Sequence, residues 1–221
     1  MAIAPDEIIR SSRKTLAIHI DAFNRIIVRA PFAVSEARIL AFLQEKEDWI
    51  NRKISERAGV CIRLPSDNLD GYTFLLLGKE HVISLINEKK IIYDEGRRTI
   101  YLPKEKSKER LVKWLKENAE RIFLSLTNQT ATRMGVKYKS VKITSTRGRW
   151  GACSPDDEIR YTYRLLYAPK EVIEYVVIHE LSHVKHKNHS KAFWTEVEKY
   201  SPDWKIHRKW LHLRGSLMEI F

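Results

Sequence analysis

The sequence has few cysteines and no long apolar run. Its two cysteines, Cys61 and Cys153, are isolated from each other, so neither a disulfide framework nor a paired-thiolate metal site is encoded. The longest apolar runs, such as the one from Phe74 to Leu77, are far shorter than the ~20 residues that cross a bilayer. The first residues also lack the pattern of a secretory signal. We therefore expect reduced thiols, no membrane association and a cytoplasmic location.

Acidic residues are in deficit. The 221 residues include 28 Asp and Glu against 40 Lys and Arg, which gives a formal net charge of +12. Such a charge attracts phosphates, nucleic acids or acidic protein surfaces without choosing among them. Hydrophobic residues make up 43% of the chain, which is enough for the core of one domain or two small ones.

The first hundred residues have the short β-branched runs and turn signals of a sheet. They also contain one stretch with apolar residues at helical spacing. We assign residues 1–102 to a mostly antiparallel β region with one helix. The expected elements are a hairpin at 15–20 and 25–30, a helix at 35–57, and antiparallel strands at 72–77, 81–86, 90–93 and 99–102.

The second half mixes long helices with short strands, so the fold class is α+β. A helical pattern follows Pro103, runs to about Met134 and ends at Gly135, a residue suited to closing a helix. A further helix starts after Pro169, and its buried face is the most apolar of the chain. The other expected elements are strands at 136–145 and 158–166, an irregular connection at 147–155, and helices from residues 190 and 201.

The apolar helix after Pro169 carries the sequence His179-Glu180-Leu181-Ser182-His183. Residues four apart lie about 40° from each other around a helix, so the two imidazoles face one point in space. Glu180 can reach a water bound to an ion held there. This is the zincin arrangement, and we assign residues 103–221 to a small zincin-like catalytic region.

A catalytic zinc usually has three protein ligands, so a third must come from elsewhere. His189 is the candidate, because Asn188 before it suits a chain reversal after the helix. Metzincins have the same spacing with a glycine where this chain has His186, which we expect to point outward. Zinc is the expected metal, although imidazoles suit other divalent transition metals. Four other histidines have no partner at ligand spacing: His19, His81, His207 and His212.

Groups for binding a substrate are less defined. Three arginines, Arg147, Arg149 and Arg164, offer bidentate contacts to phosphate. Ion pairing with acidic residues 156–158 explains them equally well. The strand at 158–166 is a candidate edge for an extended peptide. Three aromatic residues near the motifs are expected in the core: Trp150, Phe193 and Trp194.

Nearly the whole chain resembles the YgjP-like family of metal-dependent hydrolases, relatives of the WLM and SprT-like metallopeptidases. The resemblance implies His179, His183 and His189 as metal ligands and Glu180 as the catalytic residue. Ala152 and Thr162 depart from the family's usual serine and asparagine. The matching segments are 13–15, 28–31, 77–79, 149–154, 163–169, the His-Glu helix, 188–190 with 193–194, 202–204 and 208–211.

Three functions follow from these features. The first is a zinc metallopeptidase acting on peptides. The second is a nucleoside triphosphate (UTP) pyrophosphatase that uses the same metal centre, an activity that the resemblance also implies. The third is a nucleic-acid-associated module in which the ion is structural and the basic surface binds. The third has least support, because a structural zinc normally has four protein ligands and no adjacent glutamate.

Overall fold

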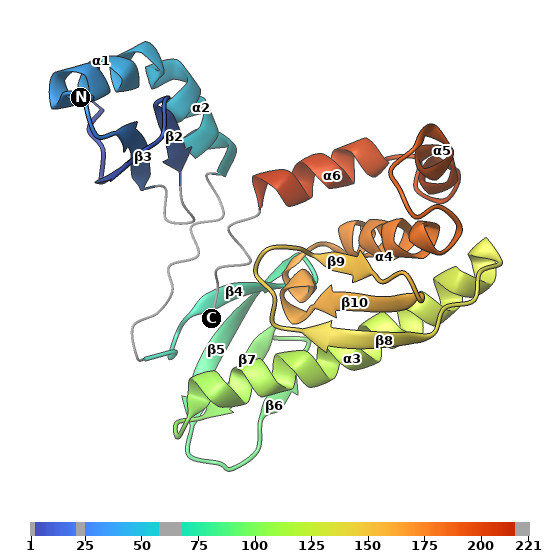
Figure 1. The fold of residues 1–221 in the computed structure, drawn as a ribbon. Coiled ribbons are helices and arrows are strands. Elements are labelled where there is room, and N and C mark those ends of the chain that lie inside the picture. The colour runs from blue at the N-terminus through green and yellow to red at the C-terminus, as the bar shows by residue number, and fades with distance from the viewer. Residues whose placement is uncertain (1–2, 21–24, 58–67, 215–221) are drawn as a thin grey trace. The chain divides into compact units, whose positions relative to one another are not determined.

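The computed structural model describes residues 3–20, 25–57 and 68–214, drawn in colour in Figure 1. Their contacts divide them into two compact units. The described residues up to 57 belong to the first unit, and those from 68 to 212 belong to the second. The α+β class is confirmed, with strands in the N-terminal part and helices toward the C-terminus. None of the described helices is long and apolar enough to cross a membrane.

The first unit contains a three-stranded sheet in the order β1-β3-β2. β2 (Ala17–Ile20) and β3 (Ile26–Pro31) are antiparallel, which confirms the hairpin; the turn between them lies outside the described residues. β1 (Glu7–Ser11) was not predicted and runs parallel to β3. The core of the unit consists of aliphatic side chains from the sheet and from two helices.

The single helix expected at 35–57 is wrong, because the segment forms α1 (Glu36–Glu45) and α2 (Glu47–Arg57). The break falls at Lys46, whose backbone has φ −109° and ψ 10°. Its N–H donates to the carbonyl of Leu43 at 3.1 Å, while its own carbonyl accepts from Ile50 at 2.9 Å. Leu43 and Ile50 are both fully buried in the same core, so both helices keep their apolar side chains on the sheet.

The second unit begins with a four-stranded sheet in the order β4-β5-β7-β6. The two hairpins β4–β5 and β6–β7 are antiparallel as expected, but β5 and β7 are parallel. The all-antiparallel prediction is wrong here because β7 returns between β5 and β6 instead of beyond β6. The strands are β4 (Thr73–Leu76), β5 (Lys79–Ile86), β6 (Ile92–Asp94) and β7 (Thr99–Pro103).

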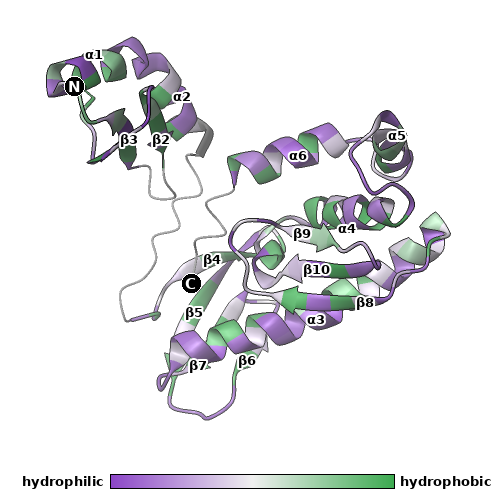
Figure 2. Ribbon diagram, viewed as in Figure 1, coloured by the Kyte–Doolittle hydropathy of each residue, from purple (hydrophilic) through white to green (hydrophobic). Residues whose placement is uncertain are grey.

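The long helix is confirmed as α3 (Ser107–Met134), which ends at Gly135 in the left-handed conformation. Hydrophilic and hydrophobic residues alternate along it (Figure 2). Its buried positions, such as Leu115 and Phe123, pack against the elements on either side. It contacts both β7 of the first sheet and β8 (Ser140–Thr144) of the next, so it joins the two sheets of this unit.

The remaining sheet has the order β8-β10-β9. β9 (Gly151–Cys153) lies within the connection that was expected to be irregular, since three residues are too few to show a strand pattern. β10 (Glu158–Thr162) is shorter than predicted, because Tyr163–Tyr167 forms the 3₁₀ helix η1. The predicted C-terminal helices are confirmed as α4 (Lys170–Lys185), α5 (Lys191–Tyr200) and α6 (Trp204–Leu213).

The β4–β5 turn attaches the four-stranded sheet to the start of α4. Leu77 donates its N–H to the carbonyl of Leu166 at 2.7 Å, and Gly78 packs so closely that a Cβ would lie 2.8 Å from the Cα of Pro169. Residues 68–102 therefore belong to the same compact unit as the C-terminal helices. The contacts place the division before residue 68, whereas the sequence placed it at 102.

We predict that Gly78→Ala lowers the free energy of unfolding by about 2–4 kcal/mol, because Gly78 combines φ +74° with the contact to Pro169. Gly71→Ala is the matched control: its φ is +71° but nothing lies within 4 Å of the added Cβ. It should cost only about 1 kcal/mol. Urea denaturation of both variants measures the difference, and equal losses would contradict the importance of the contact.

Candidate metal centre

Three imidazole rings from two segments meet at one place. His179 and His183 lie one turn apart on α4, with ring centroids 5.1 Å apart. His189 follows the helix, and its ring centroid is 5.1 Å from that of His179 and 4.7 Å from that of His183. One ligand atom from each residue lies within 4.8 Å of the others. The three residues singled out in the sequence are thus brought together.

The positions of the ring nitrogens fit a shared cation. Nε2 of His179 and Nε2 of His189 are 3.1 Å apart, close to the roughly 3.3 Å between two ligands of a tetrahedral zinc with bonds of 2.0–2.1 Å. Nδ1 of His183 bonds the carbonyl of His186 at 3.0 Å, which leaves its Nε2 for an ion. Such a second bond fixes the orientation of a ligating ring. His186 therefore contributes its backbone to the site.

Burial keeps two of these rings ready to bind metal. It lowers the pKa of His179 to about 3, and the neighbouring His183 and His189 lower it further. Burial also lowers the pKa of His183, although the bond to His186 opposes the shift. A neutral imidazole offers the lone pair that a cation needs. Neither ring has to lose a proton at neutral pH before metal binds.

Aromatic residues of α5 hold the third ring. Phe193 is fully buried, and its ring centroid lies 4.9, 4.5 and 4.8 Å from those of the three histidines. Trp194 stacks on His189 at 5.7 Å and on Trp204 of α6 at 4.2 Å. Ser190 begins α5 by accepting a hydrogen bond from the N–H of Phe193. The sequence predicted a core role for these aromatics but not their support of the ligands.

Glu180 faces the same cavity and is only 6% exposed. Burial raises its pKa to about 8, and the positive charge of Arg149 opposes the shift. The carboxylate packs against the backbone of β9: a Cβ on Gly151 would lie 2.6 Å from Oε1 of Glu180. Only glycine leaves room there. The cavity, of about 400 Å³, is lined by Arg149, Gly151, Ala152, Cys153, His179, Glu180, His183, Lys187 and His189.

The structure separates the three candidate arginines. Arg149 lines the cavity of the metal centre, whereas the lining contains neither Arg147 nor Arg164. Arg164 is 3% exposed, donates to the carbonyl of Ser145 at 2.8 Å and lies over the ring of Tyr163 at 4.5 Å. Its contacts are therefore structural.

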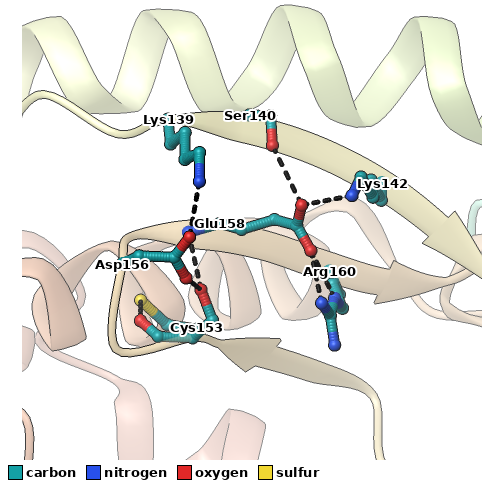
Figure 3. Close-up of polar contacts among 8 residues, drawn as sticks. Lys139, Ser140, Lys142, Cys153, Asp156, Glu158 and Arg160 are labelled. Atoms are coloured by element: carbon teal, nitrogen blue, oxygen red, sulfur yellow. Dashed lines mark hydrogen bonds and ion pairs between the residues drawn. The ribbon is translucent and has the colours of Figure 1, made fainter.

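The acidic residues that the sequence offers as partners for these arginines pair with other cations. Asp156 pairs with Lys139 at 2.5 Å, and Asp157 pairs with Lys187. Glu158 accepts from Lys142 and from Arg160 (Figure 3). Among the described residues, none of the three candidate arginines forms an ion pair with residues 156–158. Such pairing therefore does not explain why these arginines are present.

Two ring nitrogens on one helix, a third beyond it and a buried carboxylate beside them form the arrangement of a metal-dependent hydrolase. A model of the YgjP-like family, metallopeptidase domain, matches residues 14–214. The chain belongs to this family of metallopeptidases. No curated protein matches the chain.

Two solved structures are similar to part of the chain. One is the metallopeptidase zymogen of Pyrococcus abyssi abylysin, with 26% identity over 42% of this chain and 93% of that chain and a TM-score of 0.39. The other is the metallopeptidase zymogen of Methanocaldococcus jannaschii jannalysin, with 17% identity over 42% of this chain and 95% of that chain and a TM-score of 0.38.

We predict that alanine at His179, His183 or His189 weakens zinc binding by at least about 100-fold, since each removes one of three protein ligands. His186→Ala is the matched control because the backbone carbonyl that bonds His183 remains. It should change the affinity by less than about threefold. Competition with a chromophoric chelator measures all four variants, and an unchanged affinity in any ligand variant would remove that residue from the site.

We predict that Glu180→Gln stabilises the metal-free protein at alkaline pH. The pKa is about 8 in the folded chain and 4.5 ordinarily, so ionising this buried group reduces stability increasingly between these pH values. The variant should gain about 2 kcal/mol or more at pH 9 and little at pH 4.5. Denaturation across this range measures the gain, and exposed Glu171→Gln on the same helix is the control. A difference in stability between the variant and the wild type that does not change with pH would contradict the raised pKa of Glu180.

Proposed function

We propose that this protein is a zinc-dependent metallopeptidase with Glu180 as its acid/base. The observation that carries the proposal is the convergence of three histidines with Glu180 on one cavity. Imidazole ligands favour transition metals, and two of these imidazoles are neutral at physiological pH. Membership of a metallopeptidase family supports the same reaction class.

Zinc bound by three histidines supplies a Lewis acid that polarises a carbonyl and acidifies water. Glu180 takes the proton of the attacking water and later passes it to the departing nitrogen of the peptide. Burial raises the pKa of Glu180 in the metal-free protein, and a cation bound beside it would lower that pKa again, toward the neutral range that suits both steps. Gly151 lets the carboxylate lie directly beneath β9, where a bound peptide would run.

The peptide would bind along β9. The strand at 158–166 was the expected edge, but β10 is central in its sheet, with β8 on one side and β9 on the other. That expectation is wrong. Among the described strands β9 pairs only with β10, and its residues 151–153 line the metal cavity. An extended substrate can therefore add to β9 by backbone hydrogen bonds.

The other two functions have less support. Of the three arginines that favoured a UTP pyrophosphatase, only Arg149 lies at the metal centre. Association with nucleic acid rests on the net charge of +12, and much of the basic charge seen near the site is paired with carboxylates. No feature of the described residues favours either of these functions over the metallopeptidase.

We predict that the zinc-loaded protein cleaves casein and that Glu180→Gln lowers the rate by about 10²–10⁴-fold with zinc still bound, because the acid/base is lost. UTP should remain intact with either protein. Gel analysis of casein and chromatography of the nucleotide measure the two activities. Cleavage of UTP by the wild type alone would instead establish the pyrophosphatase.

A matched pair of glycine variants tests the position of the carboxylate in the same assay. Gly151→Ala places a methyl group against Glu180, whereas Gly148→Ala meets nothing within 4 Å. The first should lose most of the casein activity, and the second should retain it. Equal activities would show that the contact between β9 and Glu180 is unimportant for the reaction.

A further inference from the structure

A second cavity lies beside the metal centre. It has a volume of about 270 Å³ and shares Arg149, Gly151 and Ala152 with the metal cavity. Successive side chains of a strand point to opposite faces. On β10, Tyr161 faces the core, where it contacts Phe123 of α3, so Arg160 on the same strand lies on the other face. The lining residues outside the shared three are Thr144, Thr146, Arg160 and Thr162.

The walls of this threonine–arginine cavity are polar. They contain three hydroxyl groups and two guanidinium groups. Thr162 is 1% exposed, and its Oγ1 has no hydrogen-bond partner among the described residues. Buried hydroxyls nearly always have a partner. The unused donor at Thr162 and the two arginines both suit an acceptor that carries negative charge.

The charges around the cavity leave it positive. Arg160 is bound to Glu158, but Glu158 also accepts from Lys142 and Ser140 (Figure 3). Its single negative charge is thus shared between two cations. Arg149 is exposed and has no hydrogen-bond or ion-pair partner within the part of the chain that the structure describes. The charge of Arg149 also acts on the buried carboxyl of Glu180. An anion in the cavity would therefore meet one guanidinium without a hydrogen bond or ion pair among the described residues and one that shares Glu158 with Lys142.

The location of the cavity relates it to the substrate. A peptide that adds to β9 presents alternate side chains to the two faces of the sheet. Those on one face lie over the metal centre and Glu180. Those on the other face lie over Ala152 and Arg160, which are paired across β9 and β10. In a peptide bound in this way, a side chain next to the cleaved bond would reach the threonine–arginine cavity.

We propose that the threonine–arginine cavity is a subsite for an acidic side chain, aspartate or glutamate, of the peptide substrate. The proposal rests on the metallopeptidase function and specifies its substrate class. The carboxylate accepts hydrogen bonds from Thr162 and from the guanidinium groups of Arg149 and Arg160. The subsite selects peptides with an acidic residue beside the cleaved bond.

The test uses zinc-loaded full-length protein and pairs of peptides that differ only by Glu or Gln at each position flanking the cleaved bond. At one position the wild type should have a kcat/KM at least about tenfold higher for Glu, as two charge-assisted hydrogen bonds provide. Arg160→Gln and Thr162→Val should each reduce this ratio below about threefold. Lys137→Gln removes the same charge from an exposed residue outside both cavities and should keep the wild-type ratio.

Binding of labelled, uncut peptides to zinc-loaded Glu180→Gln separates the two proposals. Preferential binding of the Glu peptide that is lost with Arg160→Gln supports the subsite even if the wild type cleaves nothing, and then only the metallopeptidase function fails. Cleavage and binding without a preference for Glu overturn the subsite and leave the function standing. A third outcome also overturns the subsite: the Glu and Gln peptides bind equally, and inorganic phosphate displaces them from the wild type but not from Arg160→Gln. The cavity would then bind a phosphoryl group instead of a carboxylate.

Discussion

The metal centre depends on the packing of three imidazoles around the ring of Phe193. The helix sets the spacing of His179 and His183, but His189 belongs to another segment and would not face them without a support. Phe193 contacts all three rings, and Trp194 stacks on His189. Aromatic pairs of this kind prefer specific geometries, and together they can hold a ring in place. They explain how a chain that lacks the metzincin glycine still places His189, the proposed third ligand, beside the other two rings.

The burial of Glu180, the proposed acid/base, has a cost to stability. A carboxylate at 6% exposure is poorly solvated, and its pKa rises because the charged form is disfavoured. The same burial, with a cation bound beside the group, would give it a proton affinity suited to transferring protons near neutral pH. Gly151 links this group to the substrate strand, since the backbone of β9 touches the carboxylate. One contact therefore fixes the proposed acid/base against the proposed binding edge.

The sequence could place His179 and His183 together because helical spacing determines which side chains share a face. It predicted α3, α4 and α5 for the same reason. It did not predict which strand is an edge, because β9 is three residues long and the order of strands depends on contacts across the chain. The parallel pairing of β5 with β7 and the attachment of Gly78 to Pro169 are also long-range. For the same reason the sequence could not show which arginine lies at the metal cavity. Arg149 and Arg164 have the same side chain and differ only in the residues that surround them in the fold.

X-ray absorption at the zinc edge of the stoichiometrically loaded protein tests the central claim most directly. We expect three imidazole nitrogens at about 2.0–2.1 Å from the zinc and no sulfur neighbour near 2.3 Å. Multiple scattering from the rings counts the imidazoles. A spectrum with fewer than three imidazoles, or with sulfur from Cys153, which also lines the cavity, would contradict it.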